Sequence, residues 1–125
     1  MFRAIDFDNM ERIVKAAYPD PFDHCYDIAK IVQDDFGGQI YQIIGAFGYY
    51  ENHFVNVIKN VGHVFIFDFA FSQFQDEVID PEFEPSISGC LKIELNETFS
   101  LDETLFKLYQ STSIRECSNY SGALF

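Results

Sequence analysis

The sequence predicts a single α+β domain over residues 1–125, with helices near both ends and strands between them. Helical periodicity and capping residues mark the segments before residue 38 and after residue 100. Residues 39–71 are instead rich in β-branched and aromatic side chains, as strands are. Hydrophobic residues make up 48% of the chain, which suffices for a core without metal or disulfide cross-links.

Two helices are predicted before residue 39. The first has a start signal at Asp8, with a glutamate three residues later, and it ends before Pro19. The second begins near Asp23, a good N-cap residue, and ends at the glycine pair of residues 37–38, because glycine accepts the left-handed conformation common at helix ends. This assignment places Cys25 in the first turn of the second helix.

Three strands are predicted in the middle of the chain. They cover residues 39–44, 53–58 and 63–71, with a glycine-containing loop at 45–52 and a turn at 60–62. By the two-residue period of a strand, four phenylalanines of the third strand share one face: Phe65, Phe67, Phe69 and Phe71.

The last part of the chain begins with an acidic loop at residues 76–88. Residues 90–95 alternate apolar and polar side chains, which predicts a further strand. Ser100 with Glu103 forms a capping box ahead of an amphipathic helix. The polar tail from about residue 111 onward is expected to be partly disordered.

The net charge is −12, and only eight lysines and arginines are present. Phosphate contacts would be scarce, so nucleic acid is not an expected partner. The acidic surface suits solubility, or a basic partner or substrate. Residues 1–15 lack an uninterrupted apolar signal region, and no segment has membrane-spanning length without charge. We therefore expect a cytoplasmic protein, in a producing or a target cell, that does not associate with membranes.

The three cysteines are an odd number and form no CxxC pair. A disulfide framework or a zinc ribbon is therefore not expected, and a reducing compartment with at least one free thiol fits better. Cys90 and Cys117 have no histidine and aspartate in settings like those found for Cys25, and they are expected to be structural or exposed thiols.

Cys25, His53 and Asp68 form the candidate catalytic set. A thiol becomes a good nucleophile when it ionises, and both a helix start and a nearby imidazole favour the thiolate. If a two-residue loop at 60–61 joins the second and third strands, opposed residue numbers sum to 121 and His53 faces Asp68. A three-residue loop changes the sum to 122 and places His53 opposite Phe69, which would separate the pair.

Three stretches resemble the core of the papain-like cysteine hydrolase superfamily: DHCYDIAKIVQDDFGG, HFVNVI and HVFIFDFAF. They are similar to bacteriocin-processing peptidases, transglutaminase-like enzymes and papain-fold effectors, which include glutamine deamidases. The resemblance implies a nucleophile-bearing helix packed on an antiparallel sheet. It also implies that Cys25 is the nucleophile, His53 the general base and acid, and Asp68 the residue that orients His53. The expected function is cofactor-free hydrolysis of an amide in a protein or peptide substrate, either a peptide bond or a glutamine side chain, by a bacterial effector or toxin.

One feature departs from the family pattern. Papain-like peptidases usually carry a glutamine shortly before the nucleophile, where it completes the oxyanion hole, and no glutamine precedes Cys25. The oxyanion would depend on backbone N–H groups near Cys25 and Tyr26, or on another side chain. A deamidase, a transferase and an inactive relative therefore stay open beside a peptidase.

Other interpretations of the same residues also stay open. Cys25 is a structural thiol if it simply packs between helix and sheet. A metal site built from His24, Cys25, His53 and Asp68 is chemically feasible, but no ligand spacing supports it. In a different class of function, the chain is a non-catalytic acidic protein, such as an immunity protein or a phage inhibitor, that neutralises a basic protein.

Overall fold

The computed structural model describes residues 6–49, 52–60, 62–74, 77, 89–96 and 100–117. In chain order its elements are α1 (Phe7–Ala17), α2 (Cys25–Phe36), β1 (Gln39–Ile44), the 3-10 turn η1 (Ala46–Gly48), β2 (His53–Asn60), β3 (His63–Asp68), the 3-10 turn η2 (Phe71–Phe74), β4 (Leu91–Asn96), α3 (Leu101–Tyr109) and β5 (Ser113–Glu116). In this part of the chain, five antiparallel strands form one sheet in the order β4-β3-β2-β1-β5. The predicted α+β class is confirmed.

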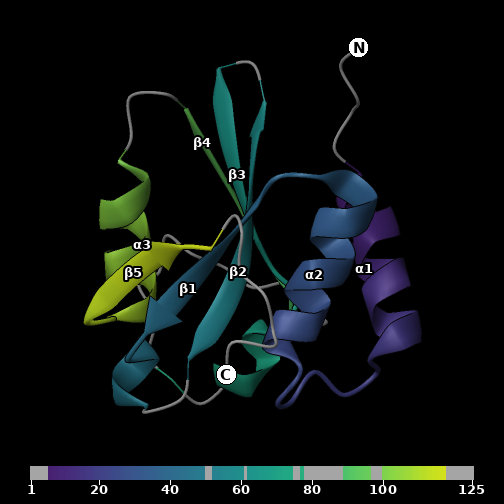
Figure 1. Cartoon of the computed structure of the whole chain (residues 1–125), viewed down its shortest axis with the longest axis horizontal. Helices are drawn as coiled ribbons and strands as arrows, with labels where there is room; N and C mark the ends of the chain where they lie inside the picture. The colour runs from purple at the N-terminus through teal and green to yellow at the C-terminus, as the bar shows by residue number, and fades with distance from the viewer. Residues whose placement is uncertain are drawn as a thin grey trace.

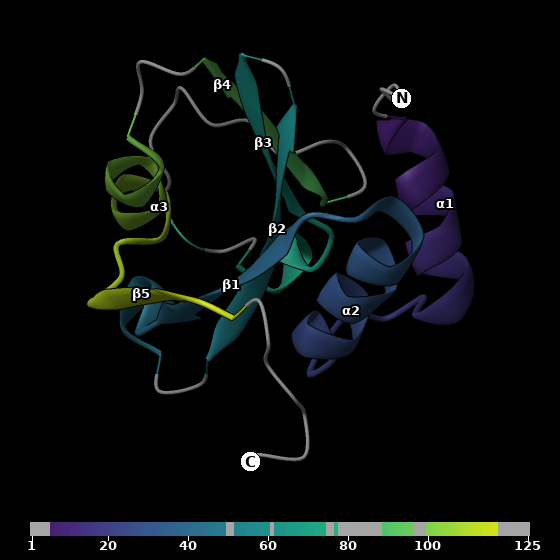
Figure 2. The same ribbon diagram turned by 45° about the horizontal axis from the view of Figure 1, so that its top comes forward.

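Helices cover both faces of the sheet (Figures 1 and 2). α1 and α2 lie on one face, over a core that includes Met10, Val14, Ile28, Val32, Ile58 and Phe67. α3 lies on the other face, over a core that includes Tyr41, Ile43, Val55, Val57, Ile66, Leu105 and Leu108. Because strand side chains alternate between faces, His53 shares the α3 side of β2 with Val55 and Val57.

The two amino-terminal helices start close to their predicted positions. α1 is capped by Asp6, whose side chain accepts a backbone hydrogen bond, two residues before the predicted start at Asp8. The predicted cap of α2, Asp23, instead has a φ of 65°, in the left-handed region that aspartate tolerates better than most residues. His24 precedes the helix without a side-chain cap, and Cys25 is the first helical residue. The prediction of Cys25 in the first turn is confirmed.

The β2–β3 hairpin differs from both predicted registers. Asn60 pairs with His63, so opposed residue numbers sum to 123 rather than 121 or 122. Continued along the strands, this register places Asp68 opposite Val55 and makes His53 its diagonal neighbour. The predicted direct opposition of His53 and Asp68 is therefore wrong by two residues. A shift of two leaves every side chain on its predicted face, because side chains alternate with a period of two.

β3 ends at Asp68, three residues before the predicted end of the strand. A turn at residues 69–70 and η2 follow. Three phenylalanines stack in a row on the side of α1 and α2: Phe65, Phe67 and Phe69. Phe71 belongs instead to the core under α3, so the prediction that four phenylalanines share a face is wrong for this residue. The turn after β3 redirects the chain and ends the alternation.

The carboxyl-terminal elements agree with the sequence in part. The predicted cap of α3 is confirmed, because the Ser100 side chain accepts a hydrogen bond from the Glu103 N–H. β4 matches the predicted strand to within one residue. The predicted disorder of the tail is wrong for Ser113–Glu116, which pair with β1 as β5. The acidic loop predicted at 76–88 lies almost entirely outside the described residues. None of the described helices has the length and apolar character to span a membrane.

Candidate active site

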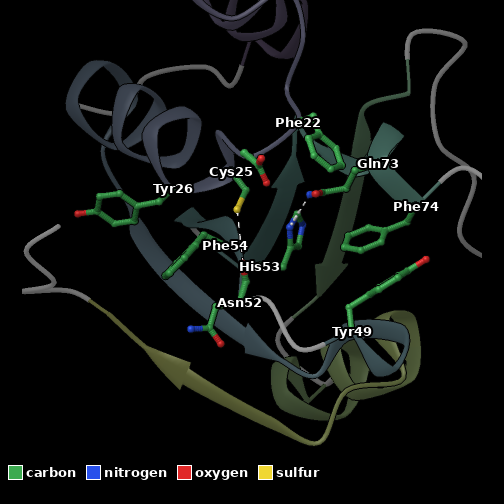
Figure 3. Close-up of a pocket in the computed structure, with 10 residues that line it drawn as sticks. Phe22, Cys25, Tyr26, Tyr49, Asn52, His53, Phe54, Gln73 and Phe74 are labelled. Carbon is green, nitrogen blue, oxygen red and sulfur yellow. Dashed lines mark hydrogen bonds between the residues drawn. The ribbon is translucent and has the colours of Figure 1, made fainter. Parts of the chain in front are cut away.

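Cys25 is the first residue of α2, at the end of the sheet where β2 begins. The first turn of a helix leaves backbone N–H groups without intrahelical partners, and the helix dipole favours negative charge there. Cys25 is half-buried, and its thiol donates a hydrogen bond to the Asn52 carbonyl oxygen, with a sulfur–oxygen distance of 3.6 Å (Figure 3). This contact ties the start of α2 to the residue just before β2.

His53 is the first residue of β2, and only 2% of its surface is exposed. Its imidazole packs edge-on against Phe74, and its Nε2 lies 2.6 Å from Oδ2 of Asp68. Its Nδ1 lies 3.0 Å from the amide nitrogen of Gln73. Both ring nitrogens are thus hydrogen-bonded, which fixes the plane of the ring.

Asp68 is the last residue of β3 and is 1% exposed. Besides the His53 imidazole, it accepts a hydrogen bond from the Tyr109 hydroxyl at 2.5 Å and one from the Ala70 N–H at 3.0 Å. A buried carboxylate is costly unless donors replace its water shell, and three donors do so here. Tyr109 is the last residue of α3, so this helix braces the site from the side opposite α2.

The three predicted residues come together at one end of the sheet. His53 and Asp68 are diagonal neighbours on the same face of the hairpin, a separation that long side chains can bridge. Cys25 belongs to the helix on the other face, but it lies at the strand end, where the sheet no longer separates the two layers. Cys25 and His53 line the same pocket, and their side chains interact. Figure 3 shows both side chains facing this shared space.

The charge state of His53 reflects opposing effects on its pKa. Burial alone lowers it, since an imidazolium loses its water shell in the interior. The negative charge and hydrogen bond of Asp68, with a smaller contribution from Cys25, outweigh burial and raise the pKa of His53 from 6.5 to about 9. His53 is therefore an imidazolium at neutral pH. Such a cation beside a thiol favours the thiolate.

Tyr109 stays protonated and can keep donating to Asp68. Burial, followed by the charge of Asp68 and their hydrogen bond, raises the pKa of Tyr109 well above its usual value. The phenol therefore holds one oxygen of Asp68, the same Oδ2 atom that accepts from His53. This arrangement restrains the carboxylate, which in turn restrains the imidazole.

The pocket around Cys25 and His53 has a volume of about 540 Å³. Most of its wall is aromatic, formed by Phe22, Tyr26, Tyr49, Phe54 and Phe74, and its polar residues are Asp23, Cys25, Asn52, His53 and Gln73. Phe22 and Tyr49 are 60% and 49% exposed. An apolar cleft with a few converging polar groups is typical of a substrate-binding site.

Two contributors to the site have no clear signal in the sequence. Gln73 lies in η2, beyond the true end of β3, and its alignment with His53 depends on the turn that the sequence prediction missed. Tyr109 is 41 residues away from Asp68 along the chain and looks like an ordinary apolar position of an amphipathic helix. Only the packing of α3 on the sheet brings its hydroxyl to the carboxylate.

Among the described residues, no group of three or more histidine, cysteine, aspartate or glutamate side chains is arranged to hold a metal ion. The arrangement of thiol, imidazole and carboxylate is suited to nucleophilic attack on a carbonyl carbon with proton transfer through the imidazole. The sequence matches no protein-family model, and no curated protein or solved structure is significantly similar to the chain. Function is therefore inferred from the geometry of the site.

Proposed function

We propose that this protein is a cysteine hydrolase of papain-like type that cleaves an amide, either a peptide bond or a glutamine side chain. One observation carries the proposal. The Cys25 thiol shares a pocket with the imidazole of His53, and the far nitrogen of that imidazole is bonded to a buried carboxylate, Asp68. A nucleophile, a base beside it and a group that orients the base are the parts that acyl transfer requires.

In the proposed mechanism, the Cys25 thiolate attacks the carbonyl carbon of the amide. A carbon–sulfur bond forms, and the carbonyl electron pair moves to the oxygen. The carbon–nitrogen bond then breaks, and the leaving nitrogen takes the proton from Nδ1 of His53, which leaves a thioester. In the second step Nδ1 removes a proton from water, the water oxygen attacks the thioester carbon, and the carbon–sulfur bond breaks to regenerate the thiolate.

Asp68 keeps the imidazole in the tautomer that this mechanism needs. Because its Oδ2 accepts from Nε2 of His53, a neutral imidazole carries its proton on Nε2 and presents an unprotonated Nδ1 to the pocket. Tyr109 donates to the same oxygen and so restrains the carboxylate. In this scheme Asp68 and Tyr109 are positioning residues that act through His53.

The proposal is tested by the alkylation rate of Cys25 with iodoacetamide at about pH 6, where an ordinary thiol is almost fully protonated. We expect Cys25 of the folded protein to react at least about tenfold faster than in the urea-unfolded chain, since an imidazolium stabilises its thiolate. Mass spectrometry assigns the label to Cys25 rather than to the buried Cys90 or Cys117. His53→Gln should remove the rate advantage. Equal rates in the folded and unfolded chain would contradict the proposal.

The net charge of −12 favours a second candidate, an acidic binding protein that neutralises a basic protein. The two candidates differ in their need for a thiol. If the chain is an effector or toxin enzyme, Cys25→Ala abolishes its effect in a cell-based assay and leaves the fold intact, whereas Cys90→Ala retains the effect. Full biological activity of Cys25→Ala would favour the binding protein.

A further inference from the structure

Gln73 is a polar side chain of the pocket that contacts His53 and that the three-residue mechanism does not use. It is half-buried in η2, and its amide nitrogen lies 3.0 Å from Nδ1 of His53, the nitrogen that faces the pocket because Asp68 holds the other one. The Gln73 amide therefore reaches the atom that exchanges protons with thiol and substrate. Figure 3 shows it entering the pocket from the side of η2, across from α2, which carries Cys25.

An amide is suited to this place because it can both donate and accept. When His53 is neutral, the Gln73 N–H group donates to Nδ1; when His53 is an imidazolium, the amide oxygen of the flipped side chain accepts from it. In the free protein the Gln73 amide can therefore form a hydrogen bond with Nδ1 of His53 in either charge state of the imidazole. A substrate that brings its leaving nitrogen to Nδ1 displaces this contact and frees the Gln73 amide, whose N–H group can then turn to the reacting carbonyl.

We propose that Gln73 is a catalytic residue: when substrate displaces its amide from His53, the amide donates its N–H to the substrate's carbonyl oxygen and stabilises the oxyanion formed when Cys25 attacks. This inference rests on the proposed function. The side-chain N–H would act together with a backbone N–H of the first turn of α2, whose N–H groups have no partner within the helix. Substrate binding would then make the oxyanion donor available, because the substrate displaces the Gln73 amide from His53.

The test compares two reactions of the Cys25 thiol in the full chain. Acylation by 4-nitrophenyl acetate passes through a tetrahedral oxyanion, whereas alkylation by iodoacetamide displaces iodide without forming one. An oxyanion donor affects only the first reaction, and loss of one such donor slows acyl transfer by about 100-fold in favourable cases. For this small ester we expect Gln73→Ala to slow the acylation burst by about tenfold or more and to change the alkylation rate by less than about threefold.

Gln73→Glu separates the two roles that Gln73 could have. A glutamate has almost the same shape and can still accept from the His53 imidazolium, but an ionised carboxylate cannot donate to an oxyanion. The proposal predicts slow acylation in Gln73→Glu, as in Gln73→Ala. Gln33→Ala is the matched control, because Gln33 is a half-buried glutamine of α2 that does not line the pocket. It should leave both rates unchanged.

Three outcomes would overturn the inference. Wild-type acylation in Gln73→Ala would show that its amide does not reach the oxyanion. An equal loss of acylation and alkylation, restored in Gln73→Glu, would make Gln73 a positioning residue for His53. If Cys25 of the wild type reacts no faster than in the urea-unfolded chain, the proposed function itself fails. That last result is seen without any Gln73 variant, so the two failures can be told apart.

Discussion

Asp68 is the residue on which the polar contacts of the site converge. Its carboxylate accepts from an imidazole, a phenol and a backbone N–H, and each donor belongs to a different part of the chain. With 1% of its surface exposed, Asp68 is a buried carboxylate and not one exposed at a sheet edge. Since buried polar groups are costly without partners, Asp68 must affect stability as well as the orientation of His53.

We predict that Asp68→Ala destabilises the fold by about 3–5 kcal/mol, because it leaves the His53 imidazole and the Tyr109 hydroxyl buried without their acceptor. Asp68→Asn should cost less, since an amide oxygen can still accept one of these hydrogen bonds. Urea unfolding of the two variants measures the difference. Alkylation of Cys25 should slow in both, and more in Asp68→Ala. Near-neutral stability of Asp68→Ala would contradict this account of the carboxylate.

At the scale of elements, the position of α2 relative to β2 decides whether Cys25 meets His53. The turn between α2 and β1 contains two glycines with φ values of +83° and +87°, at Gly37 and Gly38. A Cβ atom at Gly38 would lie 2.6 Å from the backbone oxygen of Val57 in β2, whereas one at Gly37 would have no atom within 4 Å. Of these two glycines, only Gly38 is in close contact with β2.

These two glycines form a matched pair of variants. Gly37→Ala should cost about 1–3 kcal/mol through backbone strain only. Gly38→Ala adds the clash with Val57, and overpacking of this kind costs about a further 1–3 kcal/mol. Thermal unfolding compares them directly. A similar loss of stability in the two variants would mean that β1 and β2 separate easily at this point.

The elements could be predicted from the sequence better than their contacts. β1 and the Ser100 cap of α3 follow from local patterns, and the structure confirms both. The grouping of His53 with Asp68 survived an incorrect register because the error was two residues, which preserves the face of each side chain. β5 could not be predicted, since a short polar segment becomes a strand only by pairing with β1. Gln73 depends in the same way on a turn stabilised by tertiary packing.

At the scale of the whole molecule, the raised pKa of His53 links folding to pH. The pKa is about 9 in the folded chain, against an ordinary value of 6.5. The stability that the protonated His53 contributes is therefore fully present below about pH 6.5 and is lost as the pH rises towards 9. Integrated over this window, the loss amounts to a few kcal/mol. The raised pKa of Tyr109 also makes the folded chain less stable at high pH, but only above the ordinary tyrosine pKa of 10.

The free energy of unfolding, measured in urea between about pH 6 and pH 9.5, checks this prediction. The curve for the wild type should fall across this range more steeply than the curve for His53→Gln, which has no group that titrates at this position. Asp68→Asn is a second comparison, because it removes the charge that raises the pKa of His53. Parallel curves for wild type and His53→Gln would rule out a buried imidazolium.

The contact between Tyr109 and Asp68 also has a consequence for the order in which the protein is made. During translation, Cys25, His53 and Asp68 emerge from the ribosome well before α3, which ends at Tyr109. A nascent chain that stops short of α3 contains all three residues of the proposed mechanism, yet its carboxylate lacks one of its three donors. Full restraint of the imidazole therefore waits until α3 has been synthesised and has docked on the sheet, so the complete site of the proposed mechanism assembles late in biosynthesis.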